Sequence, residues 1–211
     1  MQRILFALAI LVVTANLVVS GCINVPNFRD IAALDFSPDE EDEFTPFRKT
    51  VKRLVTNNPA RAYRTESDDL IEGIVTRVIS GDTIEVEAGG EALIVGYEGI
   101  AAPELDHISL GEQPYARQAL ERNRELVEGK LVKLEADSVE TDSDGRQLRY
   151  VYLNDIMVNA LLVYEGMAQA ESSVSRLASK HTELLFQLQN VAVTNRSGGW
   201  ETNWLNLYQR R

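Results

Sequence analysis

The stretch from Asp144 to Tyr152 pairs a tight Asp-Gly turn with an arginine at the start of an alternating strand. Arg146 therefore stands where it can clamp a phosphate, since the paired N–H donors of a guanidinium match two phosphate oxygens. Two acidic residues precede it in the chain: Asp82 in a Ser-Gly-Asp-Thr turn, and Glu104 after an Ala-Ala-Pro block. An acid, a second acid and an arginine thus follow one another, and the arginine indicates chemistry at a phosphate group.

Each of these residues also has an ordinary structural interpretation. Asp82 can be a turn residue that bonds its own backbone. Glu104, after a proline, can be a helix-start acid or a surface residue, and Arg146 can be a solvated strand edge. Taken singly, the motifs are common turns and do not decide between structure and function.

Together the blocks resemble the staphylococcal nuclease (thermonuclease) family. The resemblance runs from about Leu70 to Trp200 and includes the segments 157–159, 165–168 and 199–200 in the family's order. It implies an α+β fold, a five-stranded OB-like β-barrel with three α-helices. Such barrels bind oligonucleotides in many proteins and serve as protein-interaction modules in others, so the site has to decide the function.

The resemblance also implies a site. In the family a calcium ion lies between two aspartates and a backbone carbonyl, a glutamate positions or deprotonates the attacking water, and two arginines hold the phosphate. Matched by motif, Asp82 and the Ala102 carbonyl would be metal ligands, and Glu104 and Arg146 would be catalytic. Such groups stabilise the charge that builds on phosphoryl oxygens during cleavage.

Two family positions are not matched: the first arginine falls on Gly96 and the second aspartate on Ala101. Calcium usually takes six to eight oxygen ligands, so we expect at most a weak calcium site. An arginine acting on a phosphoryl transition state contributes roughly 10³ to 10⁵ in rate. On an unbroken strand Glu98 would share the face of Gly96 and could lend a carboxylate, whereas Arg149 should face away from Arg146.

Other candidates are weaker. His107 and His181 are far apart, and no metal-ligand spacing links them. Tyr150, Tyr152 and Tyr164 recur at strand or helix spacing, which is more typical of core residues than of base-stacking platforms.

The elements that must position these residues are readable from periodicity. A turn at 88–90, with two glycines, separates two strand regions, and Gly129 ends the first helix of the domain. The expected strands are 71–86, 92–99, 130–136 and 147–153, and the expected helices are 113–128, 157–164 and 179–194.

The amino-terminal segment 1–22 resembles a bacterial lipoprotein signal. A short basic end precedes an apolar stretch, and Ser20-Gly21-Cys22 closes it with small residues. Cys22 would be the lipidated residue, which places the protein outside the cytoplasm, anchored to a bacterial membrane in the cell envelope. The alternative is an uncleaved membrane helix, for which the apolar stretch is short. Cys22 is the single cysteine, so no internal disulfide can form.

Between the signal and the domain, residues 23–69 read as an acidic tether, with five consecutive acids at 39–43. Charged linkers repel themselves and extend. A short helix is possible within 44–58, because Thr45 can cap it and Pro46 suits its first position. The thermonuclease-like domain would then occupy residues 70–211.

Charge bears on the partner. The chain has 21 basic and 32 acidic residues, and from Leu70 onward it has 13 basic and 22 acidic. The excess of acidic residues produces a negative electrostatic field that repels phosphates. A local basic patch could still bind a phosphate, because surface charges are screened within about 8 Å. We therefore expect a monomeric, membrane-anchored binding module with weak or no phosphodiester hydrolysis and a protein or envelope partner. The alternative is a calcium-dependent endonuclease acting on extracellular DNA or RNA.

Overall fold

The structure is a computed structural model that describes residues 42–56, 70–171 and 180–202. The chain divides into two units, 1–43 and 44–211, and every element named below belongs to the second. No helix in the described part is long and apolar enough to span a membrane. The expected signal 1–22 and its Cys22 lie outside the described residues.

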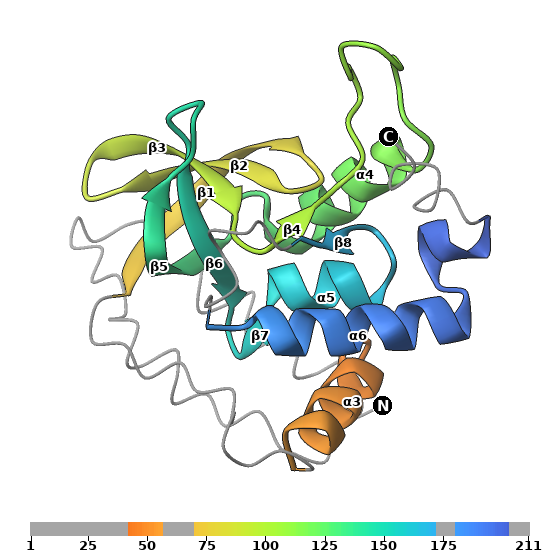
Figure 1. Cartoon of the computed structure of the whole chain (residues 1–211). Helices are drawn as coiled ribbons and strands as arrows, with labels where there is room; N and C mark the ends of the chain where they lie inside the picture. The colour runs from red at the N-terminus through yellow and green to blue at the C-terminus, as the bar shows by residue number, and fades with distance from the viewer. Residues whose placement is uncertain (1–41, 57–69, 172–179, 203–211) are drawn as a thin grey trace, which may run out of the picture. The chain divides into compact units, whose positions relative to one another are not determined.

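Five strands form a closed barrel, as the resemblance implied (Figure 1). Neighbours run in the order β3-β2-β1-β5-β6, and a parallel pairing of β3 with β6 closes the barrel. The strands are β1 (Ile71–Ser80), β2 (Thr83–Ala88), β3 (Glu91–Tyr97), β5 (Leu131–Thr141) and β6 (Gln147–Leu153). Short β7 (Ile156–Met157) pairs antiparallel with the end of β6, and β4 (Ile100–Ala101) pairs with β8 (Gln169–Ala170).

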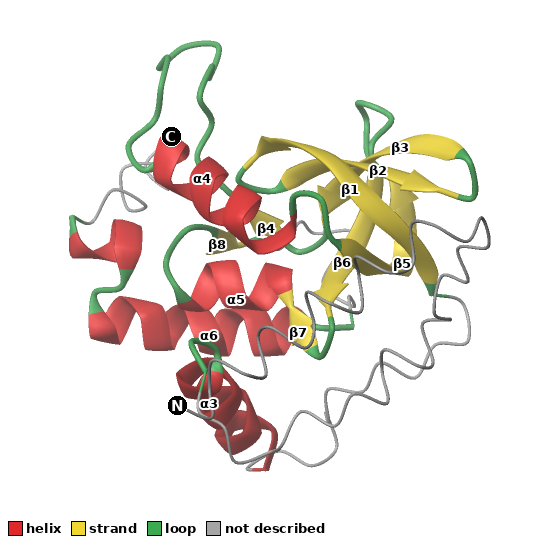
Figure 2. Cartoon of the chain, turned by 180° about the vertical axis from the view of Figure 1, so that it is seen from behind, coloured by secondary structure: helices red, strands yellow, loops and turns green. Residues whose placement is uncertain are grey.

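The described part holds four α-helices. Helices α5 and α6 lie side by side next to the barrel, as both views show (Figures 1 and 2). The helices are α3 (Thr45–Thr56), α4 (Ala116–Val127), α5 (Val158–Tyr164) and α6 (Thr182–Asn195), followed by the 3-10 turn η3 (Gly198–Glu201). The three expected helices of the barrel domain are confirmed, and α3 adds a fourth.

Several expected boundaries move for physical reasons. The strand region 71–86 is a hairpin, because Ser80 pairs with Thr83 across a two-residue turn. The first domain helix begins at Ala116 rather than Gln113, since Tyr115 has a φ of 65° and cannot be helical. Strand β3 ends at Tyr97, so the unbroken strand assumed for Glu98 was wrong.

The helix expected within 44–58 forms and belongs to the folded unit. Phe47 is buried in the main core, and its ring meets Tyr164 edge-on at 5.6 Å. Arg48 Nε donates to Asp155 at 2.9 Å. The folded unit therefore includes a helix that precedes the barrel.

Two buried asparagines hold the chain near the barrel's turns. Asn123 Nδ2 donates to the Ser80 carbonyl at 3.0 Å, and its Oδ1 accepts from the Tyr97 hydroxyl at 2.8 Å. Asn159 Oδ1 accepts from the Val151 N–H at 2.9 Å, and its Nδ2 donates to the Glu98 carbonyl at 3.0 Å. These bonds fix the end of β1, next to Asp82, and the end of β3, next to Gly96.

Candidate functional site

Three strands meet where the barrel closes. Thr83 at the start of β2 pairs with Gly96 near the end of β3, and Gly96 pairs in parallel with Leu148 of β6. The register brings the turn that carries Asp82 beside the turn that carries Arg146. The two turns are separated by more than sixty residues in sequence, so only the barrel closure joins them.

Asp142 holds Arg146 in place. Its Oδ2 accepts from Arg146 Nε at 2.7 Å, while its Oδ1 accepts from the backbone N–H groups of Arg146 and Asp144, each at 2.9 Å. Burial alone would raise the pKa of Asp142, but the bonds from Arg146 outweigh it and lower the pKa. The same carboxylate thus closes the turn and fixes the guanidinium.

A chain of hydrogen bonds connects Arg146 to Asp82. Arg146 Nη1 donates to the Thr83 hydroxyl at 3.1 Å, and this hydroxyl donates to Asp82 Oδ1 at 3.3 Å. The Ser80 hydroxyl also donates to Asp82 Oδ1, at 2.8 Å, and the Ala102 N–H donates to Oδ2 at 2.8 Å. Both oxygens of Asp82 are therefore engaged by donors, and Ala102 presents its N–H to that carboxylate.

Gly96 lies directly beside Arg146. A Cβ built on Gly96 would stand 3.7 Å from Arg146 Nε and 3.3 Å from Leu148 Cδ2. A side chain at this position would begin next to the guanidinium, and glycine supplies none. This is the place to which the resemblance assigned the first of the family's two arginines.

Glu104 is held by its backbone only. Its N–H donates to Gln113 Oε1 at 2.6 Å, and its carbonyl accepts from the Gln113 N–H at 2.9 Å. Its carboxylate is exposed and makes no hydrogen bond or ion pair with the described residues. Ala101, three residues earlier, pairs with Gln169 in the small β4–β8 sheet.

Within the described ranges, no group of three or more Asp, Glu, His or Cys residues is placed to hold a metal ion. Glu98 is 1% exposed in the turn after β3 and completes no such group with Asp82 and Glu104. Of the two metal ligands that the resemblance implied, Asp82 is already engaged by donors, and Ala102 would offer its backbone carbonyl.

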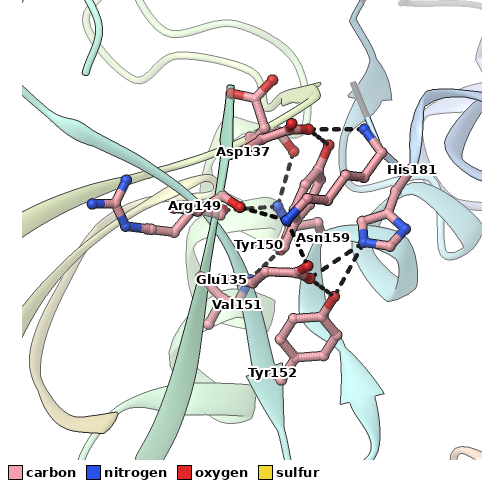
Figure 3. Close-up of polar contacts among 11 residues, drawn as sticks. Glu135, Asp137, Arg149, Tyr150, Val151, Tyr152, Asn159 and His181 are labelled. Atoms are coloured by element: carbon pink, nitrogen blue, oxygen red, sulfur yellow. Dashed lines mark hydrogen bonds and ion pairs between the residues drawn. The ribbon is translucent and has the colours of Figure 1, made fainter. Parts of the chain in front are cut away.

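A second polar grouping joins β5, β6 and the residues just before α6, and sequence reasoning missed it (Figure 3). Glu135 Oε2 accepts from the Tyr152 hydroxyl at 2.6 Å and lies 3.3 Å from His181 Nε2. Its Oε1 accepts from Lys180 Nζ at 3.0 Å. Burial would raise the pKa of Glu135, but the bonds from His181, Tyr152 and Lys180 outweigh it and lower the pKa to about 2. We call these four residues the Glu135 network.

Arg149 was expected to face away from Arg146, and Figure 3 shows its side chain on the opposite side of the strand from Tyr150, which stands at even spacing from Arg146. Its Nη1 donates to the carbonyls of Glu140 and Leu148 at 3.0 and 2.7 Å, and its Nη2 donates to Gln147 at 2.8 Å. Burial lowers the pKa of Arg149. Its guanidinium is committed to the β5–β6 end of the barrel and does not join Arg146.

Comparison with known proteins bears on this arrangement. The model of the family described as staphylococcal nuclease homologue matches residues 95–202. The thermonuclease of Staphylococcus intermedius is 34% identical over 128 residues, which are 61% of this chain and 75% of the relative. Endonuclease YncB of Bacillus subtilis is 31% identical over 142 residues, 67% of this chain and 60% of the relative. The prophage-derived endonuclease YokF of the same species is 36% identical over 102 residues, 48% of this chain and 34% of the relative.

Proposed function

The chain belongs to the staphylococcal nuclease homologue family, and we propose that its thermonuclease-like domain is a binding module with weak or no phosphodiester hydrolysis. The observation that carries the proposal is Gly96 beside Arg146. One fixed guanidinium can hold an oxyanion, but a transferring phosphoryl group spreads charge over several oxygens. Without a side chain at position 96, that charge lacks its second cationic partner.

The metal side of the site supports the same proposal. Asp82 spends both oxygens on donors from the protein, and Ala101 contributes a methyl group where a second carboxylate would stand. Oδ1 already accepts from two donors and Oδ2 from one, so the roughly four lone-pair sites of the carboxylate leave little capacity for a calcium ion. Because calcium needs several oxygen ligands, binding at Asp82 and the Ala102 carbonyl is weak.

A second candidate function is a calcium-dependent endonuclease acting on DNA or RNA. The relatives named thermonuclease and endonuclease favour it, as does the exposed, unengaged carboxylate of Glu104. In this candidate Glu104 positions or deprotonates water, Arg146 holds the phosphate, and Asp82 with the Ala102 carbonyl holds calcium.

Rebuilding the missing groups separates the two candidates. The protein from Cys22 to Arg211 is used, because Phe47 belongs to the core and a shorter fragment would lose it. Cleavage of fluorescent single-stranded DNA is followed in millimolar calcium and with chelator, for the native sequence and for Gly96→Arg with Ala101→Asp. The binding module predicts that the rebuilt variant gains about 10³-fold or more in chelator-sensitive cleavage.

The matched control is Glu104→Gln in both backgrounds. If the native sequence already cleaves at a rate that the rebuilt variant does not raise, and Glu104→Gln abolishes it, the endonuclease candidate is correct. Cleavage that persists in Glu104→Gln comes from a contaminant or from another site.

Localisation and partners are part of the proposal. Lipidation of Cys22 would anchor the protein in the cell envelope, and the acidic domain would favour a protein or envelope partner over a polyanion, with the protein itself monomeric. The mass of the amino-terminal peptide of the cell-derived protein tests the anchor. An unmodified Cys22 preceded by the intact segment 1–21 contradicts it.

A further inference from the structure

Helix α3 has a charge opposite to that of the chain. Its 12 residues include Arg48, Lys49, Lys52 and Arg53 and no Asp or Glu, whereas the whole chain has a formal net charge of −11. From Leu70 onward the acids outnumber the bases by 22 to 13. A local basic surface of this kind can act despite the overall charge, because screening limits each field to about 8 Å.

The cations gather on one side of α3. Lys49, Lys52 and Arg53 follow the i, i+3, i+4 spacing of a single helical face, and all three are exposed. The other side carries buried Phe47, with Val51 and Leu54 packed against the main core. Since the apolar face is docked on the folded unit, the basic face points away from it.

This face lies far from the candidate site. Both views show α3 beyond α6, at the opposite end of the folded unit from the β5–β6 turn that carries Arg146 (Figures 1 and 2). A ligand whose phosphate is bound by Arg146 could contact α3 only by running along the acidic barrel domain. The basic face is therefore poorly placed to extend the Arg146 site, and it suits a separate anionic surface.

We propose that the basic face of α3 rests on the anionic phospholipid headgroups of the membrane and turns the Arg146 end of the domain away from the lipid. Juxtamembrane Lys and Arg residues contribute about 1 kcal/mol each near an anionic leaflet. Three such residues bind a free protein only weakly, so the inference rests on the proposed anchor at Cys22, which keeps α3 close to the surface. The acidic barrel is repelled by the same lipids, which favours one orientation.

The single cysteine makes a direct test possible. The protein from Cys22 to Arg211, which retains every described residue, is coupled through that thiol to maleimide-bearing lipid in vesicles of phosphatidylcholine, with or without phosphatidylglycerol. Acetylation of individual lysines is then measured by mass spectrometry. We expect modification of Lys49 and Lys52 to fall several-fold on the anionic vesicles relative to the neutral ones, with recovery at high salt. Exposed Lys130, next to the barrel, should be modified equally on both.

Arg53→Glu is the matched variant, because it reverses one charge on the exposed face and leaves both reporter lysines in place. It should remove most of the protection at Lys49 and Lys52. Equal acetylation on the two kinds of vesicle would overturn the proposal. So would protection by a dissolved oligonucleotide without any by anionic vesicles, which would assign the face to nucleic acid. Chemical coupling replaces cellular lipidation, so a negative result is distinct from failure of the anchor or of the proposed function.

Discussion

The Arg146 site and the Glu135 network differ in how completely their carboxylates are used. Glu135 is 3% exposed and is contacted by Tyr152, His181 and Lys180. The Glu104 carboxylate is exposed and makes no hydrogen bond or ion pair with the described residues. The Glu135 network therefore gives both oxygens of a buried carboxylate a partner, whereas the carboxylate of Glu104 is open to water.

This difference explains how the chain can keep the fold while departing from the family's site. A buried carboxylate that loses its partners costs several kcal/mol, so the Glu135 network constrains the sequence through stability. Gly96 and Ala101 carry no such constraint, because neither position supports a buried charge. Residues that stabilise the fold and residues of the Arg146 site are thus different in this barrel. Paired substitutions, one in each region, can measure how much each region contributes to the free energy of unfolding.

Removing one charge from each region should give the largest contrast. Glu135→Gln leaves Lys180 and His181 beside an uncharged group, and we expect a loss of about 4 kcal/mol in the free energy of unfolding. Glu104→Gln, the same substitution on an exposed side chain, should change that free energy by less than about 0.5 kcal/mol. Urea unfolding followed by circular dichroism measures both, and similar losses in the two variants would contradict the comparison.

Lowering the pH should protonate Glu135 and so remove its contribution to the stability of the fold. The pKa of Glu135 is lowered from 4.5 to about 2 in the folded protein, so the carboxylate stabilises the fold above about pH 5. The contribution, about 3 kcal/mol at 1.36 kcal/mol per pKa unit, is lost as the pH falls toward 2.

The measurement is the difference in unfolding free energy between the native protein and Glu135→Gln from pH 6 to pH 2. Glutamine does not titrate, so the difference should shrink steadily below pH 5. A difference that stays constant over this range would show that Glu135 has an ordinary pKa in the folded protein.

Alanine substitutions at two glycines compare how an added Cβ affects stability in the scaffold and in the Arg146 site. Gly166 has a φ of 71°, and an added Cβ would collide with the Ser197 backbone, so Gly166→Ala should cost about 2–3 kcal/mol. At Gly96 the added Cβ meets Leu148 Cδ2 at 3.3 Å and Arg146 Nε and Cβ at 3.7 and 3.8 Å, which are side-chain contacts without a collision. Gly96→Ala should therefore stay within about 1 kcal/mol of the native protein in thermal unfolding. A large loss there would mean that glycine is required by the fold rather than left by the loss of an arginine.

The sequence predicted the barrel and its helices because those features are local or are ordered by motif. The Gly89-Gly90 turn, with φ of 61° and 86°, forms the hairpin its residues indicated, and β6 has the expected bounds. Gly96 lies beside Arg146, and the roles that the resemblance assigned to these two positions stay a prediction. The order of the motifs was enough to predict the turn and the strand, because each depends on residues that are typical of a turn or of the start of a strand.

The rest depends on tertiary contacts that no local pattern records. Glu135 and His181 are 46 residues apart on a strand and at a helix start, and neither lies in a motif. The hydrogen bond from the Ala102 N–H to Asp82 also forms because two loops approach each other in the fold, and the sequence spacing of these residues does not predict it. Glu135 is distinguished by being buried with three polar partners. Its burial depends on how the helices pack on the barrel, so it cannot be predicted from the local sequence.

The smallest expected contrast comes from removing one hydroxyl in each region. Tyr152→Phe takes a 2.6 Å donor from buried Glu135, and we expect a loss of about 1–2 kcal/mol in the free energy of unfolding. Thr83→Val removes the hydroxyl between Arg146 and Asp82, but Arg146 is 39% exposed and Asp82 keeps its bonds from Ser80 and Ala102. Water can replace the lost partner of Arg146, so the loss should stay below about 1 kcal/mol. If Thr83→Val proves the more destabilising of the two, the Arg146 site is part of the structural core, and its departures from the family would then have to be compensated within the fold.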